Sequence, residues 1–257
     1  MNVIELFNLS GKTAIVTGGG RGLGKQIAEG FAEAGANVVV CSRKLEACED
    51  VRDNLQSMGV KSMAFECDVT NPEQVQYVVD ETVKEFGSID ILVNNSGASW
   101  GAPVIDMPLQ AWHKVMEVNV TGTFLFAQAA GKEMIKQKRG KIINIASVAG
   151  LGGADPRYMD AIGYNTSKGA VITFTKDLAV KWGEYNINVN AIAPGFFPTK
   201  MSKGLIEAGG DKMLEMTPLN RFGSDDDLKG AALFLASNAS NYVTGDIVIV
   251  DGGQHAM

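Results

Sequence analysis

Residues 13–24, Thr-Ala-Ile-Val-Thr-Gly-Gly-Gly-Arg-Gly-Leu-Gly, decide the fold of this chain. A short apolar run, Thr13–Val16, enters a glycine-rich turn, and a helical pattern then continues to Ala34, where Gly35 ends it. Asn37–Cys41 reads as a second buried strand. Strand, glycine turn, helix and strand form the dinucleotide-binding unit, in which glycines let the backbone approach a pyrophosphate at the helix N-terminus. This part of the chain is therefore predicted to bind a dinucleotide.

The alternation of strands and helices continues to the end of the chain. Further strands are expected at Ser62–Phe65, Ile89–Val93, Lys141–Ile145, Ile187–Ala191 and Asp246–Val250, and further helices at Leu45–Gln56, Pro72–Glu85, Leu109–Lys136, Ala161–Trp182 and Asp226–Leu235. Seven alternating strands predict an α/β fold, a doubly wound Rossmann domain whose seven-stranded parallel sheet has helices on both faces. Residues 1–257 are expected to form one domain, with a dinucleotide-binding part at about 1–150 and a catalytic and substrate-binding part at about 147–225.

The composition excludes several classes of protein. A net charge of −6 argues against a nucleic-acid partner or an anionic membrane surface. The N-terminus lacks the pattern of a signal peptide, and no apolar run approaches membrane-spanning length. Cys41, Cys48 and Cys67 form no paired motif, and His113 and His255 lie in no ligand-spaced cluster. We therefore expect reduced thiols, a cytoplasmic location and no metal site.

Glycines and small polar residues follow the predicted strands. Because ligands of parallel α/β sheets bind at the carboxyl ends of the strands, these segments are expected to meet around one ligand. They are Gly18–Gly24, Ser42–Arg43, Asp68–Val69, Asn94–Gly97, Ala146–Ser147 and Pro194–Gly195.

Tyr164 and Lys168 lie four residues apart on a predicted helix, so the phenol and the ammonium share one face. A nearby cation favours the phenolate, which would let Tyr164 exchange a proton at neutral pH. The same spacing also occurs on solvated helix faces. The strand-end residues around the pair favour a catalytic interpretation.

Taken together, these motifs resemble those of the classical short-chain dehydrogenase/reductase family over nearly the whole chain. They are Thr17-Gly18-x-x-x-Gly22-x-Gly24, Asp68, Asn94-Asn95-Ser96-Gly97, Asn119, Ser147, Tyr164-x-x-x-Lys168, and Pro194-Gly195 followed by Thr199. The chain departs from the family pattern at Ser96, where the family usually has alanine, and in its longer segment Gly150–Ile162.

The resemblance implies hydride transfer between nicotinamide C4 and a carbonyl or alcohol carbon. Tyr164 would be the general acid in reduction and the base in oxidation, and Lys168 would lower its pKa and hold the nicotinamide ribose. Ser147 would hydrogen-bond the substrate oxygen, and Asn119 would anchor a water beside Lys168. The alternative is that Ser147 caps a strand end and Asn119 is a helix-interior amide bonded to a neighbouring carbonyl. Together with Tyr164 and Lys168, the implied cofactor-binding residues are Gly18, Gly20, Arg21, Gly22, Leu23, Gly24, Ser42, Arg43, Asp68, Val69, Asn95, Ser96, Gly97, Pro194, Gly195 and Thr199.

The residues after the second strand indicate the form of the cofactor. An acidic residue there would bind the ribose hydroxyls of NAD and repel a 2′-phosphate. The chain instead has Ser42 and Arg43, with no acid before Glu46, and both can contact a phosphate. Arg21 resembles the second basic residue of NADP-preferring relatives. We predict NADP(H), with NAD(H) as the alternative if Arg43 merely opens an exposed helix.

The substrate is left open between two chemistries. Ser99, Trp100, Ser147, Tyr158, Phe196 and Phe197 are the expected substrate-binding residues. The aromatic side chains suit an acyl chain, and the chain most resembles 3-oxoacyl reductases of the rhamnolipid-associated kind. It also resembles gluconate 5-dehydrogenases, where Arg157 or Lys200 could pair with a sugar-acid carboxylate. A dinucleotide-binding regulator without catalysis is the third reading, although Ser147, Tyr164 and Lys168 are all present.

Two further expectations concern motion and assembly. Residues 196–218 are rich in glycine and methionine, a composition that suits a mobile lid. Members of the family are usually tetramers, so the resemblance implies a homotetramer, or a homodimer, that binds a small carbonyl or alcohol substrate.

Overall fold

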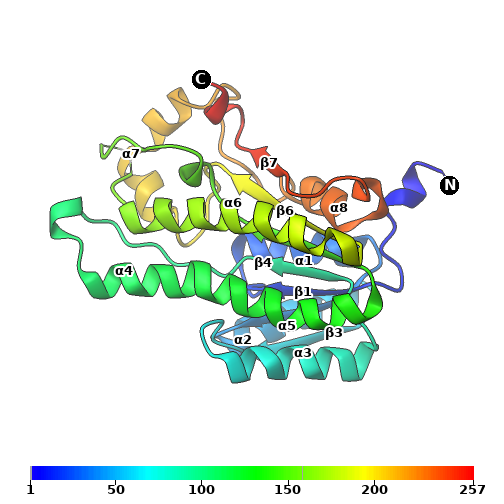
Figure 1. The fold of residues 1–257 in the computed structure, drawn as a ribbon. Coiled ribbons are helices and arrows are strands. Elements are labelled where there is room, and N and C mark those ends of the chain that lie inside the picture. The colour runs from blue at the N-terminus through cyan, green and yellow to red at the C-terminus, as the bar shows by residue number, and fades with distance from the viewer. Residues whose placement is uncertain (1, 158) are drawn as a thin grey trace.

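A computed structural model describes residues 2–157 and 159–257. Its seven strands form one parallel sheet in the order β3-β2-β1-β4-β5-β6-β7 (Figure 1). The strands are β1 (Thr13–Thr17), β2 (Asn37–Ser42), β3 (Ser62–Glu66), β4 (Ile91–Asn94), β5 (Gly140–Ile145), β6 (Ile187–Pro194) and β7 (Ile247–Val250). The predicted fold is confirmed, with a crevice expected where the strand order reverses between β1 and β4.

The sheet is buried on both faces, as its branched apolar strands require. The helices are α1 (Gly22–Glu33), α2 (Leu45–Ser57), α3 (Pro72–Phe86), α4 (Leu109–Met116), α5 (Gly122–Gln137), α6 (Ile162–Trp182), α7 (Lys203–Glu215) and α8 (Lys229–Ala236). Side chains of α1, α2 and α8, such as Phe31 and Leu55, pack on one face together with Val16 of β1. Side chains of α3, α5 and α6, such as Phe126, pack on the other together with Ile15. The side chains of neighbouring residues in one strand thus pack against opposite helix layers.

Three helices differ from the sequence prediction. The helix expected over Leu109–Lys136 is interrupted by a π-helical turn, Glu117–Thr121, between α4 and α5. The helix expected from Asp226 begins at Lys229. The lid segment contains a helix that was not predicted, α7, whose Gly209 has a non-helical backbone, so two short helical pieces meet there. Glycines and methionines in this segment obscured its helical periodicity.

Within the residues that the model describes, no helix combines the length and the hydropathy needed to cross a membrane.

Candidate active site and cofactor cleft

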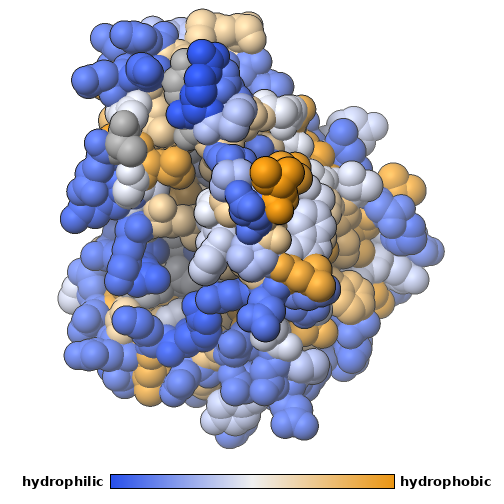
Figure 2. Space-filling view, turned by 90° about the vertical axis from the view of Figure 1, so that its left-hand side faces the viewer, coloured by the Kyte–Doolittle hydropathy of each residue, from blue (hydrophilic) through white to orange (hydrophobic). Residues whose placement is uncertain are grey.

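A large cavity opens along the carboxyl ends of the strands and has a volume of about 2200 Å³. The face shown in Figure 2 is hollowed, and hydrophilic side chains dominate the rim. Most of the residues predicted to bind cofactor line this cavity: Gly18, Gly20, Arg21, Gly22, Leu23, Ser42, Arg43, Asp68, Val69, Asn95, Ser96, Gly97, Tyr164, Lys168, Pro194, Gly195 and Thr199. Segments far apart in the sequence therefore meet at one edge of the sheet, as their strand-end positions predicted.

The glycine turn after β1 has the shape of a phosphate cradle. Gly18 and Gly22 have positive φ values of 64° and 54°, a conformation that a side chain would strain. Gly24 faces the protein instead of the cavity, since a Cβ there would lie 2.4 Å from the Asn95 side-chain nitrogen and 2.5 Å from the Gly18 oxygen. The open cradle before the N-terminus of α1 fits the pyrophosphate of a dinucleotide.

The end of β4 is tied to the end of β1 beneath this cradle. The Asn95 side chain donates hydrogen bonds to the backbone oxygens of Thr17, at 2.9 Å, and Gly18, at 3.2 Å. The backbone amides of Asn95 and Ser96 both donate to the Thr17 hydroxyl at 3.0 Å. This clamp holds the two halves of the cofactor cleft in register.

The end of the cleft beyond β2 holds the charged side chains of Asp68 and Arg43 and a Ser42 hydroxyl that is already hydrogen-bonded. Burial raises the pKa of Asp68, but hydrogen bonds from Thr70 and the charge of Arg43 outweigh it, so the carboxylate titrates below its usual range. The Ser42 hydroxyl donates to the Lys44 oxygen at 3.1 Å and accepts from the Lys44 amide at 3.2 Å. Ser42 would have to give up its bond to Lys44 before it could donate to a phosphate, whereas the Arg43 side chain lines the cavity.

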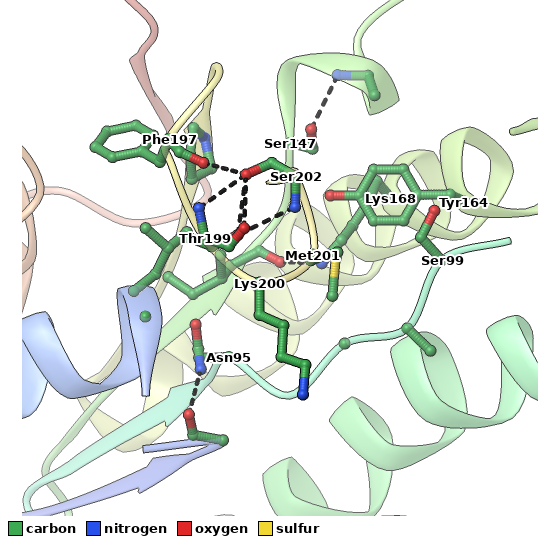
Figure 3. A pocket seen from close by; sticks show the side chains of 18 of the residues that line it. Asn95, Ser99, Ser147, Tyr164, Lys168, Phe197, Thr199, Lys200, Met201 and Ser202 are labelled. Atoms are coloured by element: carbon green, nitrogen blue, oxygen red, sulfur yellow. Dashed lines mark hydrogen bonds between the residues drawn. The ribbon is translucent and has the colours of Figure 1, made fainter. Parts of the chain in front are cut away.

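Ser147, Tyr164 and Lys168 converge at the inner end of the cavity (Figure 3). Ser147 follows β5 in an extended conformation, and its hydroxyl accepts a hydrogen bond from the Ala149 amide at 3.2 Å. The Lys168 ammonium donates to the Ile145 oxygen at 2.6 Å and lies 5.6 Å from the centre of the Tyr164 ring. One strand end and one face of α6 thus bring together three of the four side chains that were predicted to be catalytic.

The electrostatics of this group differ from the prediction. Burial raises the pKa of the Tyr164 phenol, and a hydrogen bond with the Ser147 side chain opposes that rise only in part. Lys168 was expected to lower this pKa, but its ammonium is bonded to the Ile145 oxygen. Burial lowers the pKa of Lys168 to about 8, which still leaves it largely cationic at neutral pH. In this arrangement the Tyr164 phenol is protonated at neutral pH.

Asn119 lies in the π-helical turn and is only 1% exposed. Its side-chain oxygen accepts from the Ala98 amide at 2.7 Å, while its nitrogen donates to the Ala98 oxygen at 2.9 Å and the Ser167 hydroxyl at 2.8 Å. Its amide therefore joins the loop after β4 to α6, which matches the alternative structural interpretation. The water-anchoring role of Asn119 stays a prediction.

The expected substrate residues divide into two groups. Ser99 and Phe196 line the cavity together with Ser147. Phe197 also borders it, but its side chain is only 5% exposed, packs in the core cluster of α1 and α8, and points away from Tyr164 in Figure 3. Trp100 is 46% exposed and is not among the described residues that line the cavity. Tyr158 lies outside the described residues.

Several cavity residues were missed by the sequence reasoning. Leu205, Ile206 and Met216 come from the lid segment, whose composition was the only signal, and Gln254 and His255 come from the end of the chain. The hydrogen bonds that the Asp251 carboxylate accepts from the Gly253 and His255 amides, at 2.8 and 2.7 Å, shape the turn that brings the last two there. No local sequence pattern indicated that Gln254 and His255 reach the cavity. Among the described residues, no group of three or more His, Cys, Asp or Glu is placed to hold a metal ion.

Known proteins share this architecture and sequence. A family model described as enoyl-(acyl carrier protein) reductase matches residues 18–255. Gluconate 5-dehydrogenase of Gluconobacter oxydans is 38% identical over 251 residues, which cover 97% of this chain and 96% of that protein. A 3-oxoacyl-(acyl-carrier-protein) reductase of Aquifex aeolicus is 39% identical over 246 residues, 95% of this chain and 98% of that protein. The crystal structure of a gluconate 5-dehydrogenase from Burkholderia cenocepacia, in complex with NADP and tartrate, matches with a TM-score of 0.94 at 37% identity, covering 100% of both chains.

These likenesses extend over nearly the whole chain. The chain belongs to the short-chain dehydrogenase/reductase family. It is an oxidoreductase that acts on CH–OH groups with NAD(P), so the family and the reaction type read from the motifs are confirmed.

Proposed function

We propose that this protein interconverts the ketone and secondary-alcohol forms of a small hydroxylated acid of the gluconate type, with NADP(H) as the preferred cofactor. The observation that carries the reaction is the meeting of Ser147, Tyr164 and Lys168 in the cavity that also holds the glycine cradle. The preference for a hydroxylated acid departs from the acyl chain that the sequence favoured. It is supported by the positions of Trp100 and Phe197, which were the main argument for an acyl chain.

The bound nicotinamide supplies or accepts the hydride, and the protein supplies the proton. The Ser147 hydroxyl is placed to donate a hydrogen bond to the substrate oxygen, where negative charge develops during reduction. The phenolic oxygen of Tyr164 releases its proton to the same oxygen, and its upward-shifted pKa keeps that proton on the phenol at neutral pH until it is transferred. In oxidation Tyr164 must first lose that proton, a step that becomes easier when the Lys168 ammonium faces the phenol oxygen.

The preference for NADP(H) rests on charge at the far end of the cleft. Arg21 and Arg43 both line the cavity, and the segment after β2 carries no acidic side chain before Glu46. A 2′-phosphate would gain charge-assisted hydrogen bonds from these guanidinium groups. Higher kcat/KM with NADH than with NADPH would contradict this assignment.

A second candidate, the reduction of 3-oxoacyl thioesters, is favoured by one feature of the cavity. Met201, Leu205, Ile206 and Met216 form apolar surface along the lid side. An acyl chain would bury such surface favourably, at roughly 25 cal/mol per Å². Which of the two substrate classes is preferred therefore depends on whether the apolar side chains of the lid segment or a charged side chain selects the substrate.

The nicotinamide absorbance provides the deciding assay. The enzyme is given NADPH or NADH with 5-ketogluconate and with acetoacetyl and longer 3-oxoacyl thioesters, and gluconate is tested with each oxidised cofactor. The proposal expects the highest kcat/KM with the sugar acids and NADP(H). Efficient turnover of thioesters alone would replace it with the second candidate. Failure of Tyr164→Phe to reduce turnover would refute the catalytic assignment for either substrate.

Assembly and location complete the proposal. We propose a homotetramer or homodimer, which is supported by exposed apolar side chains on α4, α5 and α6, among them Leu109 (66% exposed), Phe124 (44%) and Val180 (84%). Light scattering that found only monomer would refute it. A cytoplasmic location is supported by three buried free cysteines and is checked by cell fractionation.

A further inference from the structure

The segment that joins β6 to α7 is held by one hydroxyl. The Ser202 hydroxyl donates to the backbone oxygen of Phe197, accepts from the Thr199 amide at 2.9 Å and lies 3.2 Å from the Thr199 hydroxyl. The Lys203 amide donates to the Thr199 oxygen at 3.0 Å, which begins the helix. The bonds of the Ser202 hydroxyl are drawn in Figure 3, and together with the Lys203 bond they close residues 197–202 into a compact turn at the cavity.

This turn presents Lys200 to the cavity. Figure 3 shows the Lys200 side chain extending across the pocket toward the loop that carries Asn95 and Ser99. The residue lines the cavity, and within residues 2–157 and 159–257 its ammonium has neither a hydrogen bond nor an ion pair. Its neighbour Lys203 lines the same cavity but is paired with Glu207 at 3.7 Å. A cation that is held over a cleft without a carboxylate partner attracts an anionic ligand.

The other basic residue considered for a substrate carboxylate is placed differently. The Arg157 guanidinium donates to both oxygens of Asp155 at 3.0 Å, and its side chain is 77% exposed. Asp155 lines the cavity, whereas Arg157 is not among its described lining residues. A carboxylate that contacted Arg157 would have to compete with Asp155. This comparison leaves Lys200 as the better-placed cation of the two.

We propose that Lys200 determines specificity by binding the carboxylate of the substrate, an inference that rests on the proposed function. A phosphate of the cofactor offers the same anionic chemistry, and Thr199 lies beside Gly22 of the cradle, 3.5 Å from the position of a Cβ there. The glycine turn and the N-terminus of α1 already offer donors to the pyrophosphate, whereas a substrate carboxylate has no such cradle. The Lys200 ammonium contributes a charge-assisted hydrogen bond to the carboxylate.

Substrate pairs that differ in charge provide the test. Wild type, Lys200→Met, Lys200→Arg and the matched control Lys203→Met are assayed with saturating NADP⁺ on gluconate and on a neutral polyol such as xylitol, and KM for NADP⁺ is measured separately. Lys200→Met is expected to raise KM for gluconate about tenfold or more, the size typical of losing a hydrogen bond to a charged group, and to leave the polyol unchanged. Lys200→Arg and Lys203→Met are expected to stay near wild type.

Other outcomes separate the two proposals. If wild type turns over gluconate and Lys200→Met raises only KM for NADP⁺, Lys200 binds the cofactor phosphate and the carboxylate assignment is overturned. Equal loss on gluconate and polyol would overturn it as well. If wild type does not turn over gluconate, thermal stabilisation of the NADP⁺ complex by gluconate is compared between wild type and Lys200→Met. If gluconate stabilises wild type but not the variant, the carboxylate-binding role of Lys200 is supported and only the proposed reaction is refuted. If gluconate stabilises both proteins, or neither, the carboxylate-binding role of Lys200 is overturned.

Discussion

Replacing Gly24 by alanine tests how closely the cofactor cradle is packed. The added Cβ would lie 2.4 Å from the Asn95 side-chain nitrogen and 2.5 Å from the Gly18 oxygen. Ordinary contacts need at least about 3.4 Å, so α1 or the glycine turn must move by about 1 Å. That movement opposes the two hydrogen bonds from the Asn95 side chain to Thr17 and Gly18. We expect the free energy of unfolding to fall by about 1–3 kcal/mol, the usual cost of overpacking.

Two measurements follow from this estimate. Each kcal/mol corresponds to about 2–4 °C in the midpoint of thermal unfolding for a chain of this size. The affinity for NADPH, measured by fluorescence titration, should fall by tenfold or so if the cradle shifts by the expected distance. Gly230→Ala is the matched control, because Gly230 lies in α8 and a Cβ there would meet nothing within 4 Å. The control should be neutral or slightly stabilising. A Gly24→Ala protein that melts and binds NADPH like wild type would refute this account of the cradle.

Three shorter predictions concern catalysis, acid stability and cofactor choice. Tyr164→Phe should lose at least about a hundredfold in kcat, the size of a general-acid contribution, while far-ultraviolet circular dichroism stays native; retained turnover would contradict the proton-transfer role. Burial raises the pKa of Asp90, but hydrogen bonds from Arg139, Thr13 and Lys12 and the charge of Lys12 outweigh that rise, so its folded pKa lies below the unfolded value. The stabilising contribution of Asp90 is therefore present above the unfolded pKa and lost as pH falls through the folded pKa. The thermal unfolding midpoint of Asp90→Asn should fall less steeply with decreasing pH than that of wild type. Parallel plots of midpoint against pH for the two proteins would argue against this. Arg43→Ala should raise KM for NADPH and leave KM for NADH near its original value, and an equal rise for both cofactors would show that Arg43 does not contact the 2′-phosphate.

The order and type of most elements, and the place where they meet, could be predicted from the amino-acid sequence. Branched apolar runs such as Val38–Cys41 form buried strands because helices cover both faces of a parallel sheet. Once the strands are parallel, their carboxyl ends share one edge, which is why Gly18, Ser147 and Gly195 could be assigned to one cleft. The Tyr164–Lys168 spacing likewise needed only the geometry of a helix.

The directions of individual side chains depend on tertiary packing and could not be predicted in the same way. Phe197 was expected in the substrate pocket, but its ring packs so closely on Gly223 that a Cβ at that glycine would lie 2.2 Å from it. Lys168 is bonded to the Ile145 oxygen, and Asn119 is bonded to Ala98 and Ser167. These partners lie 20 to 50 residues away in the chain, with separations of 23, 21 and 48. Local periodicity reports which face of an element is buried, but the direction of a side chain depends on contacts that exist only after distant segments have packed together.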